Sequence, residues 1–261
     1  MKGAREIMII SSQGFGHFAQ GLNNQDFGGE TSRMLLVVDG CSGAKYSEVG
    51  TRLFTQLFLR KEECDNPEKF ENNVKEVFDD LISMMEKFYP TREDDESNET
   101  DEDSKNHESN EADKNRNEFE NDFIMENLLF TIISCFETEN EFIVKLFGDG
   151  YIVTENIRGC ISYIKFSYGK FPPYFAYKYC PSVPEYHDYE FKTFRFDKAE
   201  FSNVAIASDG IMPFAKGEIP GIDEAIKQRN NTRIVTSIRN QKMIFSDDVT
   251  IAMFGGINHE T

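Results

Sequence analysis

Aspartates recur in this sequence at the ends of apolar runs, where a strand would meet a turn. In Leu35–Gly40, for example, apolar residues lead directly into Asp39-Gly40. An Asp-Gly pair taken alone is explained as a turn, but a carboxylate beside a buried strand is costly unless it is paired or bound to a cation. The repetition of the pattern therefore favours one shared site. Its candidate residues are Asp26, Asp39, Gly40, Asp149, Asp209, Asp247 and Asp248.

If these residues converge, they form a site built from oxygen atoms alone. Carboxylates together with a backbone carbonyl, such as that of Gly40, suit Mg²⁺ or Mn²⁺ better than zinc. Two such ions about 3.5–4 Å apart can deprotonate a water held between them and stabilise an in-line displacement at phosphorus. The cations also make the close approach of several aspartates tolerable. The pattern thus points to metal-dependent phosphoryl chemistry.

The elements that must position this site are mainly short strands. Apolar residues at helical spacing predict helices over 46–59, 70–88 and 221–228, and the Pro- and Tyr-rich segment 171–189 is expected to form an irregular flap. The order of the elements is not a βαβ alternation, so it predicts an α+β protein with antiparallel sheets and helices on their outer faces. The β-rich runs predict strands at 5–12, 33–39, 128–136, 141–147, 151–155, 161–167, 190–196, 203–207 and 249–254.

The negative charge of the chain is concentrated in one segment. From Arg92 to Asp122 there are 14 acidic and 4 basic side chains, a net charge of −10 out of −18 for the whole chain. Such a segment buries too little apolar surface to offset its ordering entropy, so we expect a disordered acidic insertion at 91–122. An acidic chain without a basic stripe also argues against nucleic-acid binding.

The remaining composition bears on the cellular compartment. No segment has the features of a signal peptide or the length of a membrane span. The 5 cysteines are odd in number and widely spaced, without a Cys-x-x-Cys pair. That spacing favours reduced thiols over disulfides or a zinc site. We therefore expect a cytoplasmic protein with no membrane partner.

The acidic motifs, taken in order, resemble those of the PP2C family of metal-dependent phosphatases. The resemblance runs from about Ile7 to Phe254, and Asn-Gln-Asp in the first motif is similar to a divergent bacterial branch. It implies one domain over 1–261, interrupted by the acidic insertion, with a four-layer α/β/β/α sandwich of two antiparallel sheets flanked by helices. The motifs are Asn24-Gln25-Asp26, Val38-Asp39-Gly40, Gly148-Asp149-Gly150, Ser208-Asp209-Gly210 and Asp247-Asp248-Val249-Thr250.

The resemblance also implies two Mn²⁺ or Mg²⁺ ions, with a third in some members. Asp39 would bridge the two metals, with the carbonyl of Gly40 on one of them. Asp209 and Asp247 would complete the shell of the other metal. Asp26 would contact the metal site through water, and Asp149 would help to hold the third ion. Asp248, where asparagine is commoner, would orient its neighbours rather than ligate.

Two positions depart from the family pattern. Gly21 stands where many members have a phosphate-binding arginine, and Cys41 where several have a general-acid histidine. The divergent bacterial branch has His-x-x-x-Gly before its Gln-Asp, which makes His17 a candidate for phosphate contact or proton donation; the alternative is that His17 only caps a loop. Cys41 is interpreted as a small buried neighbour rather than a nucleophile, because water attacks in this mechanism. The lone Gly14-Phe15-Gly16 is too weak a signal for a nucleotide-binding loop.

The resemblance implies hydrolysis of phosphoserine and phosphothreonine in proteins, through a water that bridges the two ions. The implied partners are a phosphoprotein substrate and a cognate Ser/Thr kinase, and we expect a monomer. The departures at Gly21 and Cys41 motivate one alternative, a pseudophosphatase or regulatory binding module on the same fold. A second alternative is an acidic scaffold that acts through the insertion. Affinity for Mn²⁺ separates the enzyme from a binding module without metal.

Overall fold

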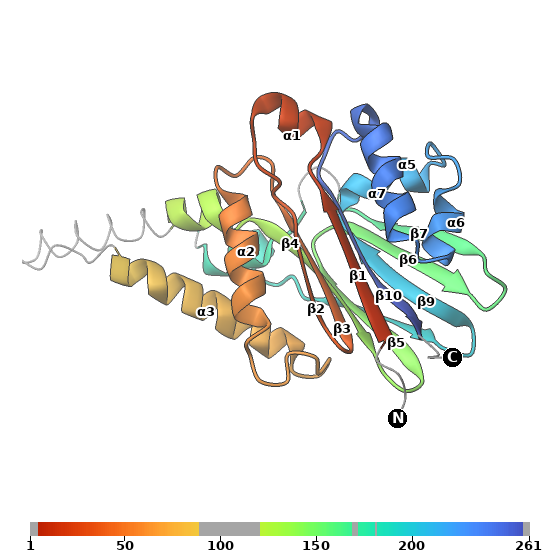
Figure 1. Ribbon diagram of the computed structural model, residues 1–261. Coiled ribbons are helices and arrows are strands. Elements are labelled where there is room, and N and C mark those ends of the chain that lie inside the picture. The colour runs from red at the N-terminus through yellow and green to blue at the C-terminus, as the bar shows by residue number, and fades with distance from the viewer. Residues whose placement is uncertain (1–4, 89–120, 169–171, 181, 258–261) are drawn as a thin grey trace, which may run out of the picture.

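Two antiparallel sheets pack face to face, and helices cover the outer face of each (Figure 1). The computed structural model describes residues 5–88, 121–168, 172–180 and 182–257. The first sheet, sheet A, contains β1 (Arg5–Ser12), β10 (Val249–Ile257), β9 (Phe201–Ala207), β6 (Gly150–Asn156) and β7 (Ile161–Phe166), in that spatial order. The second, sheet B, contains β2 (Phe27–Thr31), β3 (Met34–Gly40), β4 (Phe130–Glu137), β5 (Glu141–Phe147) and β8 (Lys192–Asp197).

The helices form two groups, one on the outer face of each sheet, and one further short helix connects β1 to β2. α2 (Ser47–Phe58) and α3 (Phe70–Phe88) cover sheet B, while α5 (Met212–Ala215), α6 (Ile222–Lys227) and α7 (Asn231–Asn240) cover sheet A. α1 (Phe15–Gln20) lies in the connection from β1 to β2. Residues 121–127 are also helical. Short 3₁₀ turns are η1 (Phe175–Tyr179), η2 (Pro184–Tyr186), η3 (Asp209–Ile211) and η4 (Lys242–Ile244).

Strand β3 shows why the sheets are buried on both sides. Its side chains alternate in direction, as in any strand. Leu35 and Val37 point into the core between the sheets, together with Ile206 and Phe254 of sheet A. Met34, Leu36 and Val38 point the other way, into the core beneath α2 and α3. A strand covered on both faces is apolar along its length, so the continuous run 34–38 follows from the layering. The predicted four-layer α/β/β/α architecture is confirmed.

Most of the elements predicted from the sequence are present, with small shifts of their ends. The structure also contains elements that the sequence did not predict: β2, α1, α5, α7 and the helical residues 121–127. β2 contains Gly28 and Gly29, which have low strand propensity. A Cβ on either would lie 2.6–2.7 Å from the side chain of Ile9 or Thr55, so the glycines allow neighbouring elements to approach closely. In the polar helix α7, the side chain of Asn230 accepts the backbone N–H of Arg233, an N-cap that identifies this helix in hindsight.

Two expectations about connecting segments are modified by the structure. The part of the predicted flap that is described forms only 3₁₀ turns, as expected for an irregular segment, but it is packed rather than loose. Tyr174, Phe175 and Tyr177 are at most 9% exposed and belong to the core of sheet B. Of the acidic insertion 91–122, all but residues 121 and 122 lie outside the described residues, and these two begin the helical stretch 121–127.

The described helices were also compared with what a bilayer requires. None of them combines the length with the apolar character that a membrane-spanning helix needs.

Aromatic rings join α3 to both sheet B and the 3₁₀ turn η1. Phe78 is fully buried, and its ring centroid lies 4.9 Å from that of Phe175 and 5.5 Å from that of Phe130. We expect Phe78→Ala to lower the free energy of unfolding by about 3–5 kcal/mol, because it leaves a cavity among these rings. Met84→Ala on the same helix should change it by less than about 1 kcal/mol, since Met84 is 42% exposed. Urea denaturation of both variants measures the difference, and equal losses would contradict this packing.

Candidate active site

The antiparallel arrangement brings the predicted aspartates to one end of the sandwich. Asp39 lies near the end of β3, and Asp209 stands two residues after the end of β9. Asp26, Asp149 and Asp247 stand one or two residues before β2, β6 and β10. Neighbouring antiparallel strands run in opposite directions, so the C-terminal ends of β3 and β9 lie at the same end of the sandwich as the N-terminal ends of β2, β6 and β10. The backbone N–H of Asp209 lies 3.5 Å from Oδ2 of Asp39, which joins the edges of the two sheets across the site.

The pKa values show how closely these carboxyl groups approach one another. Burial raises the pKa of Asp39 well above its usual range, and the charges of Asp26, Asp209, Asp247 and Asp149 raise it further. The five predicted aspartates therefore form one electrostatic cluster.

The other members of the cluster are perturbed in the same direction. Burial, opposed by a hydrogen bond from Ser208, raises the pKa of Asp26 to about 7. Burial and then the charge of Asp247 raise the pKa of Asp209 to about 6. Burial is also the main cause of the raised pKa values of Asp149 and Asp247. Carboxylates in this state favour a bound cation, because it replaces the solvation that they have lost.

The donor atoms at the site fit hard divalent cations. Among the described residues, the buried side-chain oxygens without a hydrogen-bond partner include Oδ2 of Asp26 and Oε1 of Gln25. Gly40 lies against Gln25, where a Cβ would be 2.7 Å from the Gln25 carbonyl oxygen. Carboxylate, amide and carbonyl oxygens are the ligands that Mg²⁺ and Mn²⁺ prefer. The described residues thus include buried oxygen atoms beside the aspartates that have no hydrogen-bond partner.

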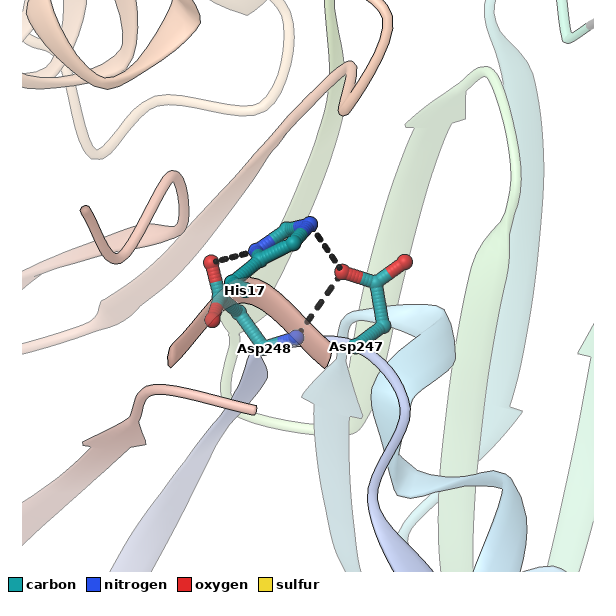
Figure 2. A group of neighbouring side chains, drawn as sticks. All are labelled: His17, Asp247 and Asp248. Atoms are coloured by element: carbon teal, nitrogen blue, oxygen red, sulfur yellow. Dashed lines mark hydrogen bonds and ion pairs between the residues drawn. The ribbon is translucent and has the colours of Figure 1, made fainter. Parts of the chain in front are cut away.

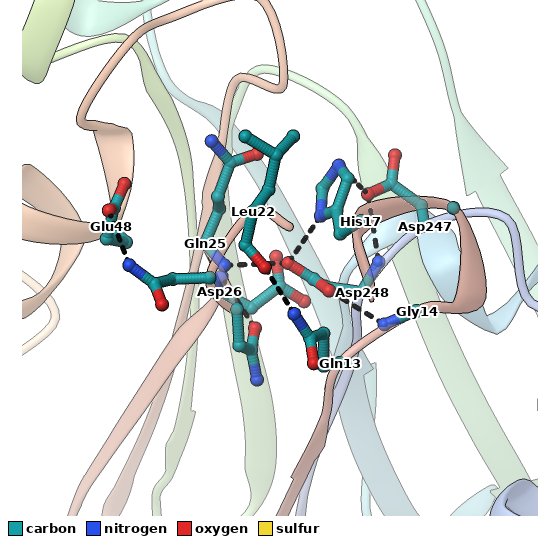
Figure 3. Close-up of polar contacts among 12 residues, drawn as sticks. Gln13, Gly14, His17, Leu22, Gln25, Asp26, Glu48, Asp247 and Asp248 are labelled. Carbon is teal, nitrogen blue, oxygen red and sulfur yellow. Dashed lines mark hydrogen bonds and ion pairs between the residues drawn. The ribbon is translucent and has the colours of Figure 1, made fainter. Parts of the chain in front are cut away.

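Asp248 connects three parts of the chain at the edge of this cluster. The side chain is only 1% exposed in the folded chain. One oxygen accepts the backbone N–H of Gly14 at 2.8 Å. The other accepts the backbone N–H of Gln25 at 2.7 Å and pairs with Nδ1 of His17 at 2.8 Å (Figure 3). Through these contacts Asp248 joins the turn before α1, the loop before β2 and the ring of His17. Its role in orienting these neighbours rather than ligating stays a prediction.

His17 is buried, and its ring lies between two carboxylates. Since the oxygens of Asp248 act as acceptors, Nδ1 of His17 is the donor in that pair. Nε2 faces Oδ1 of Asp247 at 3.4 Å (Figure 2). One donor atom from each of His17, Asp247 and Asp248 lies within 4.8 Å of the others, a spacing compatible with a metal. With Asp248 already occupied, the geometry favours an oriented imidazole whose Nε2 points toward the aspartate cluster.

Two glycines bring His17 into this position. A Cβ at Gly14 would lie 2.2 Å from the carbonyl oxygen of Asp247, and one at Gly16 would lie 2.2 Å from that of Ser246. The start of α1 therefore packs directly on the backbone before β10. Gly14-Phe15-Gly16 is thus a packing motif, a role that the sequence alone did not suggest. His17 does not merely cap a loop, because its ring pairs with Asp247 and Asp248.

The structure also places the two departures from the family pattern. Gly21 ends α1 with a φ of +71°, a backbone conformation that would be strained in any residue with a side chain. A Cβ there would meet no atom within 4 Å, so the constraint at this position is the backbone and not space. Cys41 is partly buried and lies beside Tyr174, whose hydroxyl pKa is raised mainly by burial and further by Cys41. Sequence reasoning included Ser208 in the motif Ser208-Asp209-Gly210 but gave it no role at the site. It missed Tyr174 altogether, because nothing in the sequence linked Tyr174 to Asp39.

Comparisons with known proteins agree with this architecture. A family model described as protein phosphatase 2C matches residues 13–239. A comparison with curated protein sequences found no match.

Solved structures with the same fold are bacterial phosphatases. A bacterial serine phosphatase aligns with a TM-score of 0.57 at 14% identity, over 98% of this chain and 99% of the other. The catalytic domain of the serine/threonine phosphatase PstP, in complex with two manganese ions, aligns with a TM-score of 0.58 at 15% identity, over 96% and 97%. Serine/threonine phosphatase Stp1 from Staphylococcus aureus aligns at 0.52 with 15% identity, over 97% and 95%. At such identities the likeness establishes the fold.

Replacing Asp26 and replacing Asp248 by asparagine should change the free energy of unfolding in opposite directions. The folded-state pKa of Asp26, about 7 against the ordinary 3.8, means that its contribution to stability is present below pH 4 and is lost as pH rises through 7. At pH 7.5 with a chelator, Asp26→Asn should therefore stabilise the protein by about 1–3 kcal/mol. Asp248→Asn should destabilise it by a similar amount, because an amide cannot replace all three acceptor contacts.

Thermal unfolding with and without Mn²⁺ measures these effects. The gain in Asp26→Asn should shrink or reverse at saturating Mn²⁺, since the variant binds the ion less well. Destabilisation of Asp26→Asn in the chelator would contradict the account of the cluster given above.

Proposed function

The chain belongs to the protein phosphatase 2C family, and on that premise we propose that it hydrolyses phosphoserine and phosphothreonine in proteins with the help of two divalent cations. The observation that carries the proposal is the position of Asp39. Its carboxylate is partly buried, and the charges of Asp26, Asp209, Asp247 and Asp149 act on it. A group so placed is destabilised unless positive charge lies beside it.

The proposed roles of the residues follow from this cluster. Asp39 would bridge two Mn²⁺ or Mg²⁺ ions, with the Gly40 carbonyl on one and Asp209 and Asp247 on the other. Asp26 would act through water. Bound ions would supply an activated water nucleophile and neutralise the charge that develops at phosphorus.

The side-chain placement also supports Asp149 as part of a third, weaker cation site. Its pKa is raised by burial and by Asp247 but lowered by Lys165, so it feels both the cluster and a positive charge. This position at the margin of the cluster fits weaker binding.

His17 is proposed as the proton donor to the leaving oxygen. When water attacks phosphorus, the bond from phosphorus to the serine or threonine oxygen breaks, and that oxygen must gain a proton. The Nδ1–H of His17 is held by Asp248, which orients Nε2 toward the cluster. Donation from Nε2 requires the imidazolium form, in which Nδ1–H faces Asp248 and Nε2–H faces Asp247. Transfer of the Nε2 proton to the leaving oxygen then leaves the neutral imidazole protonated at Nδ1. Cys41 has no base beside it among the described residues, which supports a spectator role for its thiol.

Several broader features are part of the same proposal. One family model spans both sides of segment 91–122, which supports one domain with an insertion. All five cysteines lie in the described part of the chain as thiols, in keeping with a cytoplasmic location. We propose that the protein works as a monomer on a phosphoprotein, opposite a Ser/Thr kinase.

A regulatory binding module on the same fold is the second candidate. The glycine at position 21 and the cysteine at position 41 favour it, because both replace groups that the family uses on the phosphate or the leaving group. The preserved carboxylate cluster favours the enzyme, since its burial is costly without cations. Calorimetry with Mn²⁺ separates a module that lacks metal affinity from the proposed enzyme.

The hydrolase predicts Mn²⁺-dependent release of phosphate from p-nitrophenyl phosphate and from a phosphoserine peptide. Asp39→Ala and Asp209→Asn should each reduce kcat by at least about 10³-fold, because the charge that holds the cations is removed. Asp223→Asn, in helix α6 and hydrogen-bonded to Tyr163, is a carboxylate control that should keep its activity. No turnover by the folded wild-type protein with Mn²⁺ or Mg²⁺ would reject the enzyme.

Loss of His17 should affect the two substrates unequally. The p-nitrophenolate ion is a stable leaving group and needs no proton. The serine oxygen must gain a proton as it leaves, because an alkoxide is strongly basic. We expect His17→Ala to reduce kcat about 10²-fold for the phosphoserine peptide and much less for p-nitrophenyl phosphate. The alkaline limb of the pH profile for the peptide should also change, because a general acid loses its proton there. His187→Ala, whose ring contacts the carbonyl of Cys180, is the matched control. An equal loss on both substrates would assign His17 a structural role instead.

A further inference from the structure

A phosphate dianion that enters the site must meet positive charge besides the cations. Position 21 cannot supply it here. Gly21 ends α1 in the left-handed backbone region with φ of +71°, and its N–H is bonded to the carbonyl of Phe18. An arginine at this position would carry a backbone strain that glycine avoids. A cation for the phosphate has to come from another element of the fold.

Lys165 stands near the end of β7, at the same edge of sheet A as the aspartates. In the register of the sheet, Lys165 pairs with Tyr151 of β6, and Tyr151 pairs with Ala207 of β9. Asp149 precedes Tyr151 by two residues, and Asp209 follows Ala207 by two. Lys165, Tyr151 and Ala207 therefore lie side by side across three neighbouring strands. Each of the two aspartates is two residues from this row.

The ammonium group of Lys165 is exposed but lies close to the cluster. Nζ is 6.0 Å from the ring centroid of Tyr151, which is itself 3% exposed. The charge of Lys165 lowers the pKa of both Asp149 and Asp209. Asp209 in turn raises the pKa of the Tyr151 hydroxyl. Lysine, tyrosine and aspartates are therefore near neighbours at the rim of the site.

Several other cations of the sandwich are already paired with carboxylates. Lys145 pairs with Glu71, Lys198 with Glu137 and Arg229 with Glu155. Lys165, by contrast, forms no salt bridge with a carboxylate of the described residues under a 4.0 Å limit. Its partners at longer range are the aspartates that would hold cations. Once cations neutralise those aspartates, the ammonium group is free to attract a different anion.

We propose that Lys165 binds the phosphate group of the substrate at the rim of the carboxylate cluster and takes the place of the arginine that position 21 lacks. The proposal rests on the proposed phosphatase function. It assigns to β7 a residue that binds the phosphate group through its charge and makes no contact that depends on the peptide sequence. A lysine suits this place because a flexible stem carries a point charge that can follow the phosphate as it enters.

The test compares Lys165→Ala and Lys165→Arg with the wild-type, metal-loaded protein. Removal of a charge-assisted contact should raise KM for p-nitrophenyl phosphate and for the phosphoserine peptide about tenfold, with a smaller change in kcat. The inhibition constant of inorganic phosphate should rise by a similar factor. Lys165→Arg should restore most of the affinity. The side chain is exposed, so thermal unfolding should show that the variants keep the fold.

Arg158→Ala is the matched control for the loss of one positive charge. Arg158 is exposed in the turn at the other end of the β6–β7 hairpin, roughly 20 Å away at about 3.3 Å per strand residue. It should leave KM and phosphate inhibition unchanged. Equal effects of the two variants, or none from Lys165→Ala, would overturn the assignment of Lys165 while leaving the phosphatase intact.

Calorimetry with inorganic phosphate and Mn²⁺-loaded protein makes the test independent of turnover. Weaker phosphate binding by Lys165→Ala than by the wild type would support the proposal even if the wild type did not hydrolyse the substrates. Absence of phosphate binding by the wild-type protein would overturn it. Absence of wild-type hydrolysis, by itself, counts only against the proposed enzyme.

Discussion

The loss of solvation by clustered carboxylates, together with their mutual repulsion, is the constraint on which this structure depends. Asp39 lies among four other aspartates, and burial together with their charges raises its pKa well above the usual range. The same constraint raises the pKa of Asp26 and Asp209 to about 7 and 6. A fold that concentrates charge in this way gives up stability at neutral pH unless cations are bound. The cluster is therefore best understood as the preorganised half of a metal site, in which the protein supplies oxygen atoms at fixed positions.

A second group of contacts, centred on Asp248, holds the segments around the aspartate cluster in place. Asp248 joins the turn before α1, the loop before β2 and the imidazole of His17. It is adjacent to Asp247, whose Oδ1 accepts the backbone N–H of Asp248 at 2.9 Å. Small residues at positions 14 and 16 let α1 rest on the backbone that carries both aspartates. Substrate-facing and metal-facing groups are thus positioned by the same buried carboxylate, so a change at Asp248 would disturb both.

The layered fold explains how such different segments reach one place. Antiparallel pairing brings strand ends and strand starts to the same edge, and two sheets packed face to face bring their edges together. Helices on the outer faces stabilise the sheets without covering that edge (Figure 1). Related phosphatases keep this architecture at about 15% identity, because apolar alternation can be met by many sequences.

The sequence by itself determined the layers and the acidic residues of the site. Apolar runs such as 34–38 predicted buried strands, and aspartates at their ends predicted a cluster, because both signals are local in the chain. Only the tertiary structure decided how the groups between the motifs are used. Nothing in the sequence predicted the strand that contains Gly28 and Gly29, and only the structure shows that the side chains of Ile9 and Thr55 pack against these glycines. The pairing of His17 with Asp248, 231 residues apart, and the place of Lys165 beside Asp149 and Asp209 follow from strand register and helix packing, and no local pattern encodes a contact between such distant residues.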